Sequence, residues 1–143
     1  MVELKIKLLN PNATLPKYQT SGASGFDLCS SENLIIKGGE YALVSTGLSF
    51  SFDEKYEIQV RPRSGLALKH GVSILNTPGT IDSDYRGEVK VILINHSTKD
   101  FTINIGDRIA QGVLCPIEKA QIKEVLTLDD TERGANGFGS TGK

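Results

Sequence analysis

The chain has 143 residues, of which 38% are apolar and 23% are charged, and its net charge is −1. The length suits one domain, and the composition excludes a disordered chain. The near-neutral charge disfavours a surface that binds nucleic acid, so any phosphate site has to be local. The longest apolar run, residues 91–94, is too short to span a membrane, and the alternating N-terminus does not resemble a signal peptide. We therefore expect a cytoplasmic protein with no membrane or nucleic-acid partner.

Short apolar segments separated by Gly, Asn, Pro and Asp follow one another along the chain. Their alternation and their content of Val, Thr and aromatic residues predict strands at residues 4–8, 43–52, 56–60, 89–95 and 101–105. Residues 89–95 are apolar on both faces, which predicts a strand covered on both sides. Only residues 64–70 are able to form a helix, and a short one. Many short strands with regular turns predict an all-β sandwich or jelly-roll barrel.

The last thirteen residues, TERGANGFGSTGK, are rich in glycine and have no apolar periodicity. Such a segment cannot bury enough surface to order itself. The sequence therefore predicts a folded core over residues 1–130 and a flexible tail over residues 131–143. Phe138 stands between two glycines in this tail. A frayed end and a lid that closes over a ligand both remain open at this point.

The two cysteines, Cys29 and Cys115, are far apart in the sequence. A zinc site needs about four ligands, and neither His70 nor His96 has the spacing to complete one. We expect two reduced thiols with a structural role.

A first candidate site begins where a strand ends at Pro62. Arg63, Ser64 and Gly65 then supply a cation, a hydroxyl group and a residue that lets a ligand approach the backbone. Backbone N–H groups in such a turn can bind phosphate, and an arginine adds charge-assisted hydrogen bonds. The pattern alone is weak, because arginine and serine in a turn are usually surface residues.

A second candidate site lies in residues 76–88. Pro78 and Gly79 suit the centre of a type II turn, which predicts a hairpin with accessible backbone N–H and C=O groups. Asn76 carries a donor and an acceptor, which together can read the edge of a base. Asp82 follows an apolar residue, so we expect it to be partly buried and able to act as a general base toward water. A turn-forming aspartate and a core Tyr85 are the alternatives.

Residues 24–28 and 106–111 do not indicate a function by themselves. The order in which all these segments occur along the chain does indicate one. The chain resembles the trimeric dUTPase family, whose five motifs occur here in order as ASGFDL (residues 23–28), RSGLA (63–67), GTIDSDYRGE (79–88), GDRIAQ (106–111) and RGANGFGSTG (133–142). The departures are small: Ser24 stands where Ala is common, Phe26 where Tyr is common, and Asn136 where Gly is common. None of them removes a reactive group.

The resemblance implies an all-β, distorted jelly-roll barrel of the β-clip type that forms a homotrimer, with three subunits sharing each active site. It implies hydrolysis of dUTP to dUMP and pyrophosphate, which limits uracil in DNA and supplies dUMP for dTMP synthesis. Asp82 would activate the water that attacks the α-phosphorus. Mg²⁺ would be bound through substrate oxygens and water. Asp27 would act on the metal through a water molecule.

The resemblance also implies which residues bind the substrate. Phosphate would be bound by Arg63, Ser64, Gly65 and Gln111, and uracil would be read by Asn76 and the backbone around Thr80 and Ile81. Tyr85 would pack against the deoxyribose and exclude a 2′-hydroxyl group. Lys90 either touches the nucleotide or is an ordinary strand lysine. The tail of a third subunit would supply Arg133, Phe138, Gly139, Ser140 and Thr141.

Two other interpretations remain in view. One is an enzyme resembling dCTP deaminase on the same fold, and the other is a non-catalytic jelly-roll module that binds nucleotides. The segment containing Asp82 and Tyr85 and the tail containing Phe138 favour the dUTPase interpretation over both.

Overall fold

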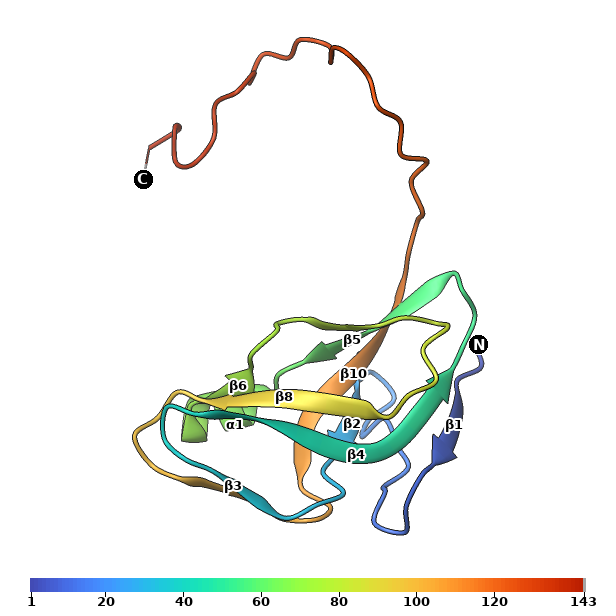
Figure 1. Ribbon diagram of the computed structural model, residues 1–143, viewed down its shortest axis with the longest axis vertical. Helices are drawn as coiled ribbons and strands as arrows, with labels where there is room; N and C mark the ends of the chain where they lie inside the picture. Colours follow the sequence, from blue (N-terminus) through green and yellow to red (C-terminus); the bar gives the residue numbers. More distant parts are fainter. Residues whose placement is uncertain (143) are drawn as a thin grey trace.

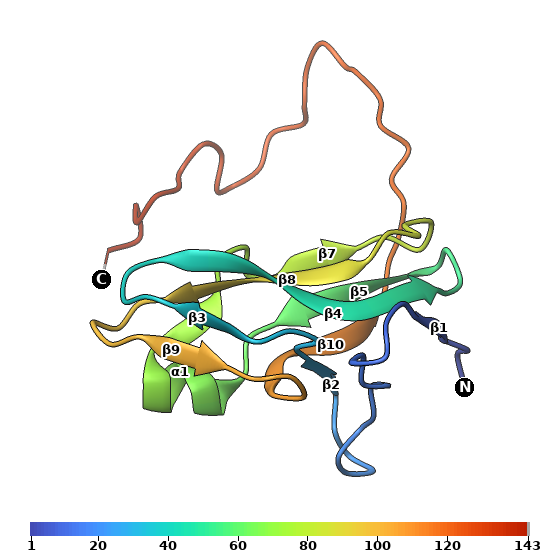
Figure 2. The ribbon, with the colours of Figure 1, turned by 60° about the horizontal axis from the view of Figure 1, so that its bottom comes forward.

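Ten strands and one helix occur in the computed structural model, which describes residues 1–142. One antiparallel sheet has the order β1 (Lys5–Leu8), β4 (Tyr41–Ser51), β8 (Val89–Asn95) and β6 (Val72–Ile74). A second has the order β2 (Phe26–Cys29), β10 (Arg108–Pro116), β5 (Tyr56–Arg61) and β7 (Gly79–Ile81). A ribbon of β3 (Leu34–Ile36) and β9 (Phe101–Ile103) lies at one end (Figures 1 and 2). The predicted all-β architecture is confirmed.

The core lies between the two larger sheets, because alternate residues of each strand point inward. Its most fully buried apolar side chains include Leu28, Val44, Leu48, Ile58, Leu93 and Ile109. Burial of one such side chain stabilises the fold by about 1.5–3 kcal/mol relative to leaving it exposed. The strands that carry the site are therefore rigidly held.

Strand β8 has the predicted bounds but only one covered face. Val89, Val91 and Leu93 are buried in the core, whereas Ile92 and Ile94 are half-buried on the outer face. The neighbouring strand β4 adds Leu43 to this outer face, and its side chain is exposed. The expectation of cover on both sides is wrong for the single chain, because its second sheet lies against one face only.

Helix α1 (Ser64–His70) connects β5 to β6, with the predicted bounds. Arg63 precedes it in an extended conformation, and Gly71 ends it at φ 64°, where a residue without a Cβ is favoured. The Gly71 N–H donates to the Ala67 carbonyl at 3.0 Å. At the start of the helix, the Ala67 N–H donates to the Arg63 carbonyl at 3.1 Å, which holds the backbone of Arg63 at the strand-to-helix junction.

The connection from β6 to β8 does not contain the predicted type II turn. Gly79 is the first residue of β7, with an extended backbone, and the Thr77–Pro78 peptide bond is cis. Strand β7 pairs with β5 of the second sheet, whereas β6 pairs with β8 of the first. The loop thus crosses between sheets, and this long-range pairing outweighs the local turn preference of Pro-Gly.

Residues 118–142, called here the arm, extend away from the strands (Figure 1). The last backbone hydrogen bond to the core runs from the Ile117 N–H to the Lys55 carbonyl at 2.9 Å. Residues 118–136 are all exposed, and so is Phe138. The predicted division at residue 130 stays a prediction, and the extended segment itself begins at residue 118.

Both cysteines are free, and Cys29 is buried. Burial, with the nearby Asp27 carboxylate as a smaller cause, raises the pKa of the Cys29 thiol above its usual value, so this thiol stays protonated.

Among residues 1–142, no helix is long and apolar enough to cross a membrane.

Candidate active site

Two arginines flank one carboxylate at the end of the second sheet. The pairing of β10 with β2 and β5 places Gln111 opposite both Asp27 and Arg61. Arg63 Nε lies 3.5 Å from Asp27 Oδ1, and Arg108 Nη1 lies 3.4 Å from Asp27 Oδ2. Arg63 also donates from Nη1 to the Arg108 carbonyl at 3.0 Å. Asp27, Arg63, Arg108 and Gln111 are called here the arginine cluster.

The arginine cluster carries one more positive than negative charge and is partly open to solvent. The Asp27 side chain is 15% exposed, whereas those of Arg63 and Arg108 are 27% and 48% exposed. Partly exposed ion pairs of this kind contribute about 0–1 kcal/mol to stability, so their main effect is to orient the guanidinium groups. Guanidinium groups held in a fixed direction are well suited to bind phosphate.

Gln111 is held close to the backbone of two neighbouring segments. Its Nε2 donates to the Pro62 carbonyl at 3.1 Å. A Cβ atom at Gly25 would lie 2.6 Å from Gln111 Oε1, so a larger residue at position 25 would displace this side chain. Ser64 and Gly65 are exposed beside it at the start of α1, where the first backbone N–H groups have no acceptor within the helix.

A separate pocket of about 600 Å³ lies beside β7. Its lining, called here the β7 pocket, consists of Leu43, Asn76, Thr80, Ile81, Asp82, Tyr85, Glu88, Val89, Lys90 and Ile92. The structure thus brings together all six residues that were predicted to read the base and sugar, activate water or lie near the hairpin. Asp82 is exposed within the single chain, so the expectation of partial burial is wrong for this state. The reason is that Asp82 follows the edge strand β7, which no further strand covers.

Tyr85 is fixed in one orientation at the rim of the β7 pocket. Its hydroxyl group donates to the Glu88 carbonyl at 3.0 Å. Its ring folds over Gly87, where an added Cβ would lie 2.3 Å from the Tyr85 hydroxyl oxygen. Glycine at position 87 is therefore required for this ring position, and the ring is half exposed toward any ligand.

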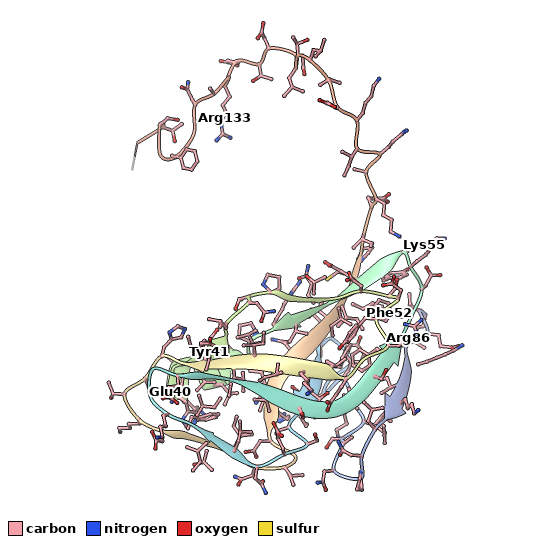
Figure 3. The ribbon with its side chains drawn as sticks, viewed as in Figure 1. Glu40, Tyr41, Phe52, Lys55, Arg86 and Arg133 are labelled. Atoms are coloured by element: carbon pink, nitrogen blue, oxygen red, sulfur yellow. The ribbon has the colours of Figure 1, made fainter. Side chains whose placement is uncertain are left out.

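Arg86 is a residue of this region that the sequence did not single out. Its Nη1 donates to the carbonyls of Ser83 at 2.6 Å, Tyr85 at 3.2 Å and Phe50 at 3.4 Å. Ser49 Oγ in turn donates to the Arg86 carbonyl at 2.7 Å. Figure 3 shows Arg86 beside the end of β4, near Phe52. Arg86 thus ties the loop that carries Asp82 and Tyr85 to the first sheet, a role for which the sequence pattern gives no signal.

Glu88 was also missed as an organising residue. Its Oε1 accepts from the Gly47 N–H at 3.0 Å, and its Oε2 lies 3.5 Å from Lys90 Nζ. Gly47, at φ 70°, lies where the pairing of β4 with β8 shifts register. The carboxylate therefore joins the irregular part of β4 to the lysine at the edge of the β7 pocket.

The arginine cluster and the β7 pocket lie far apart in one chain. Ile81 pairs with Ile58, so Asp82 lies level with Glu57 at the start of β5. Arg63 lies beyond the other end of β5, six residues further along. At about 3.3 Å per residue, this separation is about 20 Å. No residue of the arginine cluster lines the β7 pocket.

The arm does not bring its predicted residues to either place. Arg133 lies on the arm, away from the strands (Figure 3). Phe138, Gly139, Ser140 and Thr141 follow it and are exposed. The structure of one chain therefore assembles the arginine cluster and the β7 pocket, and the predicted residues of the arm contact neither of them.

The carboxylates of the described chain do not form a dedicated metal site. Within residues 1–142, no group of three or more His, Cys, Asp or Glu side chains is placed to hold a metal ion. Each carboxylate oxygen of Asp27 lies near an arginine, so Asp27 is better placed to orient these cations than to coordinate a metal directly. A divalent cation here would take most of its ligands from phosphate and water, as Mg²⁺ commonly does.

Comparison with known proteins identifies the family of this chain. The family model of dUTPase matches residues 11–142. Deoxyuridine 5′-triphosphate nucleotidohydrolases of Nautilia profundicola and Wolinella succinogenes are 62% and 61% identical over 99% of this chain, which covers 100% and 96% of those proteins.

Solved structures agree with the sequence comparison. A Staphylococcus bacteriophage 80alpha dUTPase with dUPNHPP is similar at a TM-score of 0.91 and 28% identity, over 99% of both chains. A dUTPase of phage phi11 of S. aureus, described with a structural Mg(II) ion, is similar at a TM-score of 0.83 and 25% identity, over 90% of this chain and 99% of that one. These neighbours bear out the jelly-roll, β-clip fold class, and this chain belongs to the dUTPase family.

Proposed function

We propose that this protein hydrolyses dUTP to dUMP and pyrophosphate, and that each active site combines residues of several subunits. The single observation that carries the proposal is the β7 pocket, in which a group able to read a base, a tyrosine ring and an exposed carboxylate face one cavity. The names of the relatives support the same reaction. The reaction removes dUTP that would place uracil in DNA and provides dUMP for dTMP synthesis.

Uracil is read by Asn76 and by the backbone of β7 near Thr80 and Ile81. An amide and a backbone segment offer both donors and acceptors, which match the edge of uracil. Cytosine presents an amine where uracil has a carbonyl, so one buried polar group stays unpaired. That mismatch costs about 1–3 kcal/mol or more.

Asp82 is the proposed general base. It accepts a proton from the water that attacks the α-phosphorus, and the bond to the bridging oxygen of pyrophosphate breaks. Its exposure in the single chain leaves it accessible to a second subunit and to the water between them. General base catalysis by a positioned carboxylate contributes about 10²–10⁴-fold to the rate.

Tyr85 selects the sugar, and Lys90 lies at the same pocket. The ring of Tyr85 is fixed by Gly87 and Glu88, so it presents an unyielding surface to a 2′-hydroxyl group. Lys90 lines the β7 pocket and is held by Glu88, which favours a contact with the nucleotide over an undirected surface position.

The arginine cluster is the proposed triphosphate site. Arg63 and Gln111 donate to phosphate oxygens, together with Ser64 and the backbone of Gly65. Asp27 holds the arginines in place and contacts metal-bound water. Mg²⁺, bound through phosphate oxygens and water, supplies charge neutralisation for the leaving pyrophosphate.

A homotrimer would bring the separate parts together. The distance of about 20 Å between Asp82 and Arg63 along β5 means that a nucleotide seated in the β7 pocket of one chain needs the arginine cluster of another. The half-buried outer face of β4 and β8 lies next to the β7 pocket, so a subunit that covers it also reaches the nucleotide. Closed symmetry repeats this arrangement at each interface.

The end of the arm is the proposed lid, supplied by a third subunit. Arg133, Ser140, Thr141 and the N–H of Gly139 would contact the γ-phosphate, and Phe138 would stack on uracil. A stack of a base on an aromatic ring contributes about 1–3 kcal/mol. The exposure of Phe138 supports this role, because its ring gains nothing from its own chain.

The experiment is an incubation of the protein with dUTP or dCTP and Mg²⁺, with pyrophosphate and ammonia measured together. Pyrophosphate from dUTP without ammonia from dCTP is the expected result. Ammonia from dCTP would favour a deaminase, and no product from either would favour a binding module. Light scattering tests the trimer, with three chains per particle expected.

A further inference from the structure

The arm contains the one Asn–Gly pair of the sequence, Asn136–Gly137. The other asparagines precede Pro, Ala, Leu, Thr, His or Ile. An asparagine side chain reacts with the backbone nitrogen of the next residue most readily when that residue is glycine, because no Cβ hinders the approach. Asn136 is also exposed, so water reaches it freely.

The two reacting groups themselves make no hydrogen bonds in the described chain. In residues 1–142, neither the Asn136 side-chain amide nor the Gly137 N–H makes a hydrogen bond. A Cβ placed at Gly137 would find no atom within 4 Å. The amide nitrogen of Gly137 is therefore free to approach the side chain of Asn136 as the arm moves.

Arg133 contacts the peptide group that has to react. Its Nε donates to the Asn136 carbonyl at 2.9 Å, while the Asn136 N–H donates to the Arg133 carbonyl at 3.2 Å. The Asn136 carbonyl belongs to the same peptide group as the Gly137 nitrogen. When that nitrogen loses its proton, negative charge spreads onto the carbonyl oxygen, where a guanidinium stabilises it by a charge-assisted hydrogen bond.

We propose that Asn136 is a site of spontaneous deamidation that Arg133 promotes, and that the change weakens closure of the arm over the nucleotide. The Gly137 nitrogen gives its proton to water or hydroxide and bonds to the Asn136 side-chain carbon, and ammonia leaves. Water then opens the resulting succinimide at either carbonyl. The net reaction converts one amide and one water into one carboxylate and one ammonium ion, leaving aspartate or isoaspartate.

The consequence for closure rests on the proposed function of the arm. Either product adds a negative charge two residues before Phe138, close to where the arm would meet the γ-phosphate. Isoaspartate also adds a methylene group to the backbone, which shifts Phe138 relative to Arg133. Like charge and altered spacing both oppose a closed arm on a triphosphate.

Peptide mass mapping of the full-length protein, aged in mildly alkaline buffer, tests the chemistry without any assay of function. The expected result is a mass gain of about one dalton at Asn136 well before any at the exposed Asn12, Asn76 or Asn104, with isoaspartate among the products. Gly137→Ala is the matched variant, because its Cβ meets open space and its φ is not positive. It should slow the change several-fold.

Arg133→Gln tests the proposed promotion, again by mass alone. Loss of the charge-assisted bond should slow deamidation by about fivefold. A mass gain at another asparagine first, or none at Asn136, would overturn the modification site. An unchanged rate in Arg133→Gln would overturn the role of Arg133.

Turnover of dUTP is then followed in the same aged samples, each relative to its own fresh activity. The expected result is a fall in wild type that parallels the mass change, with unchanged melting, and no such fall in Gly137→Ala. Complete deamidation with full turnover would overturn the effect on closure while the modification site stands. A fresh protein that does not hydrolyse dUTP would instead contradict the proposed function, and the mass result would be unaffected.

Discussion

Apolar residues are buried between the two larger sheets, called here the β core, but are exposed in the arm. Leu28 and Ile58 of the core are 0% exposed, whereas Ile122 of the arm is 95% exposed and Leu126 is fully exposed. Both parts of the chain lie in the same solvent. The difference in exposure of their apolar side chains therefore reflects what each part packs against. The core supplies its own partner in the facing sheet, and the arm has none in its own chain.

This contrast separates two sources of order. Packing inside one chain fixes the arginine cluster and the β7 pocket before any ligand is present, which reduces the ordering cost of binding. Under the proposed function, the arm is ordered by a ligand or another subunit, as is typical of segments that close over a site. Core residues should therefore govern chemistry and stability, and arm residues should govern closure.

The largest expected effect is that of Asp82→Asn in the β7 pocket. Loss of the general base should lower kcat by about 10²–10⁴-fold and leave nucleotide binding nearly intact. Steady-state release of pyrophosphate and calorimetric binding of dUMP would measure the two quantities. A variant that keeps more than a tenth of the wild-type kcat would remove Asp82 from this role.

Removal of residues 131–143 should have the next largest effect. Activity should fall by about 10²-fold, because the site loses contacts to the γ-phosphate and admits water. Melting should stay close to that of wild type, since Phe138 and its neighbours are exposed.

Leu28→Ala is the matched control in the core, and it should lower the free energy of unfolding by about 2–5 kcal/mol. A truncated protein with full activity would contradict the lid. Dissociation into monomers would show that the segment holds subunits together, and the contrast between core and arm would fail.

Tyr85→Ala should change selectivity more than rate. Without the ring, the ratio of kcat/KM for dUTP over UTP should fall by about tenfold, because a 2′-hydroxyl group then fits. Tyr85→Phe keeps the ring and loses only the hydrogen bond to the Glu88 carbonyl, so it should retain most of the selectivity. If the ratio stays unchanged in Tyr85→Ala, sugar selection lies elsewhere.

Arg86→Gln should have the smallest effect of the four. The loop with Asp82 and Tyr85 loses the side-chain bonds of Arg86 to the Phe50 carbonyl of the first sheet and to the Ser83 carbonyl within the loop, and kcat/KM should fall by about fivefold, as about 1 kcal/mol implies. The control Ser49→Ala removes only the bond to the Arg86 carbonyl and should have a lesser effect. A fall in melting temperature without any change in kcat/KM would show that Arg86 stabilises the fold alone.

Local patterns predicted several elements well. Helix α1 and strand β8 occupy the expected residues, because the first lies between a helix start at Ser64 and the stop at Gly71, and the second is a continuous apolar run. The turn at Pro78 and Gly79 was predicted wrongly, since β7 pairs with a strand about twenty residues earlier in the chain. The roles of Arg86 and Glu88 were not predicted, because each also contacts a backbone group of the distant strand β4, the Phe50 carbonyl and the Gly47 N–H.

The sequence by itself determined the fold class and the family and indicated the residues proposed to carry the reaction, because these follow from periodicity and from motifs read in order. Only the tertiary structure decided how those residues are grouped. It placed Asp82 and Tyr85 in one pocket, Arg63 and Gln111 in a cluster about 20 Å away along β5, and Phe138 in neither. Motif order carries no distances, and distances arise from strand pairing between segments far apart in the chain.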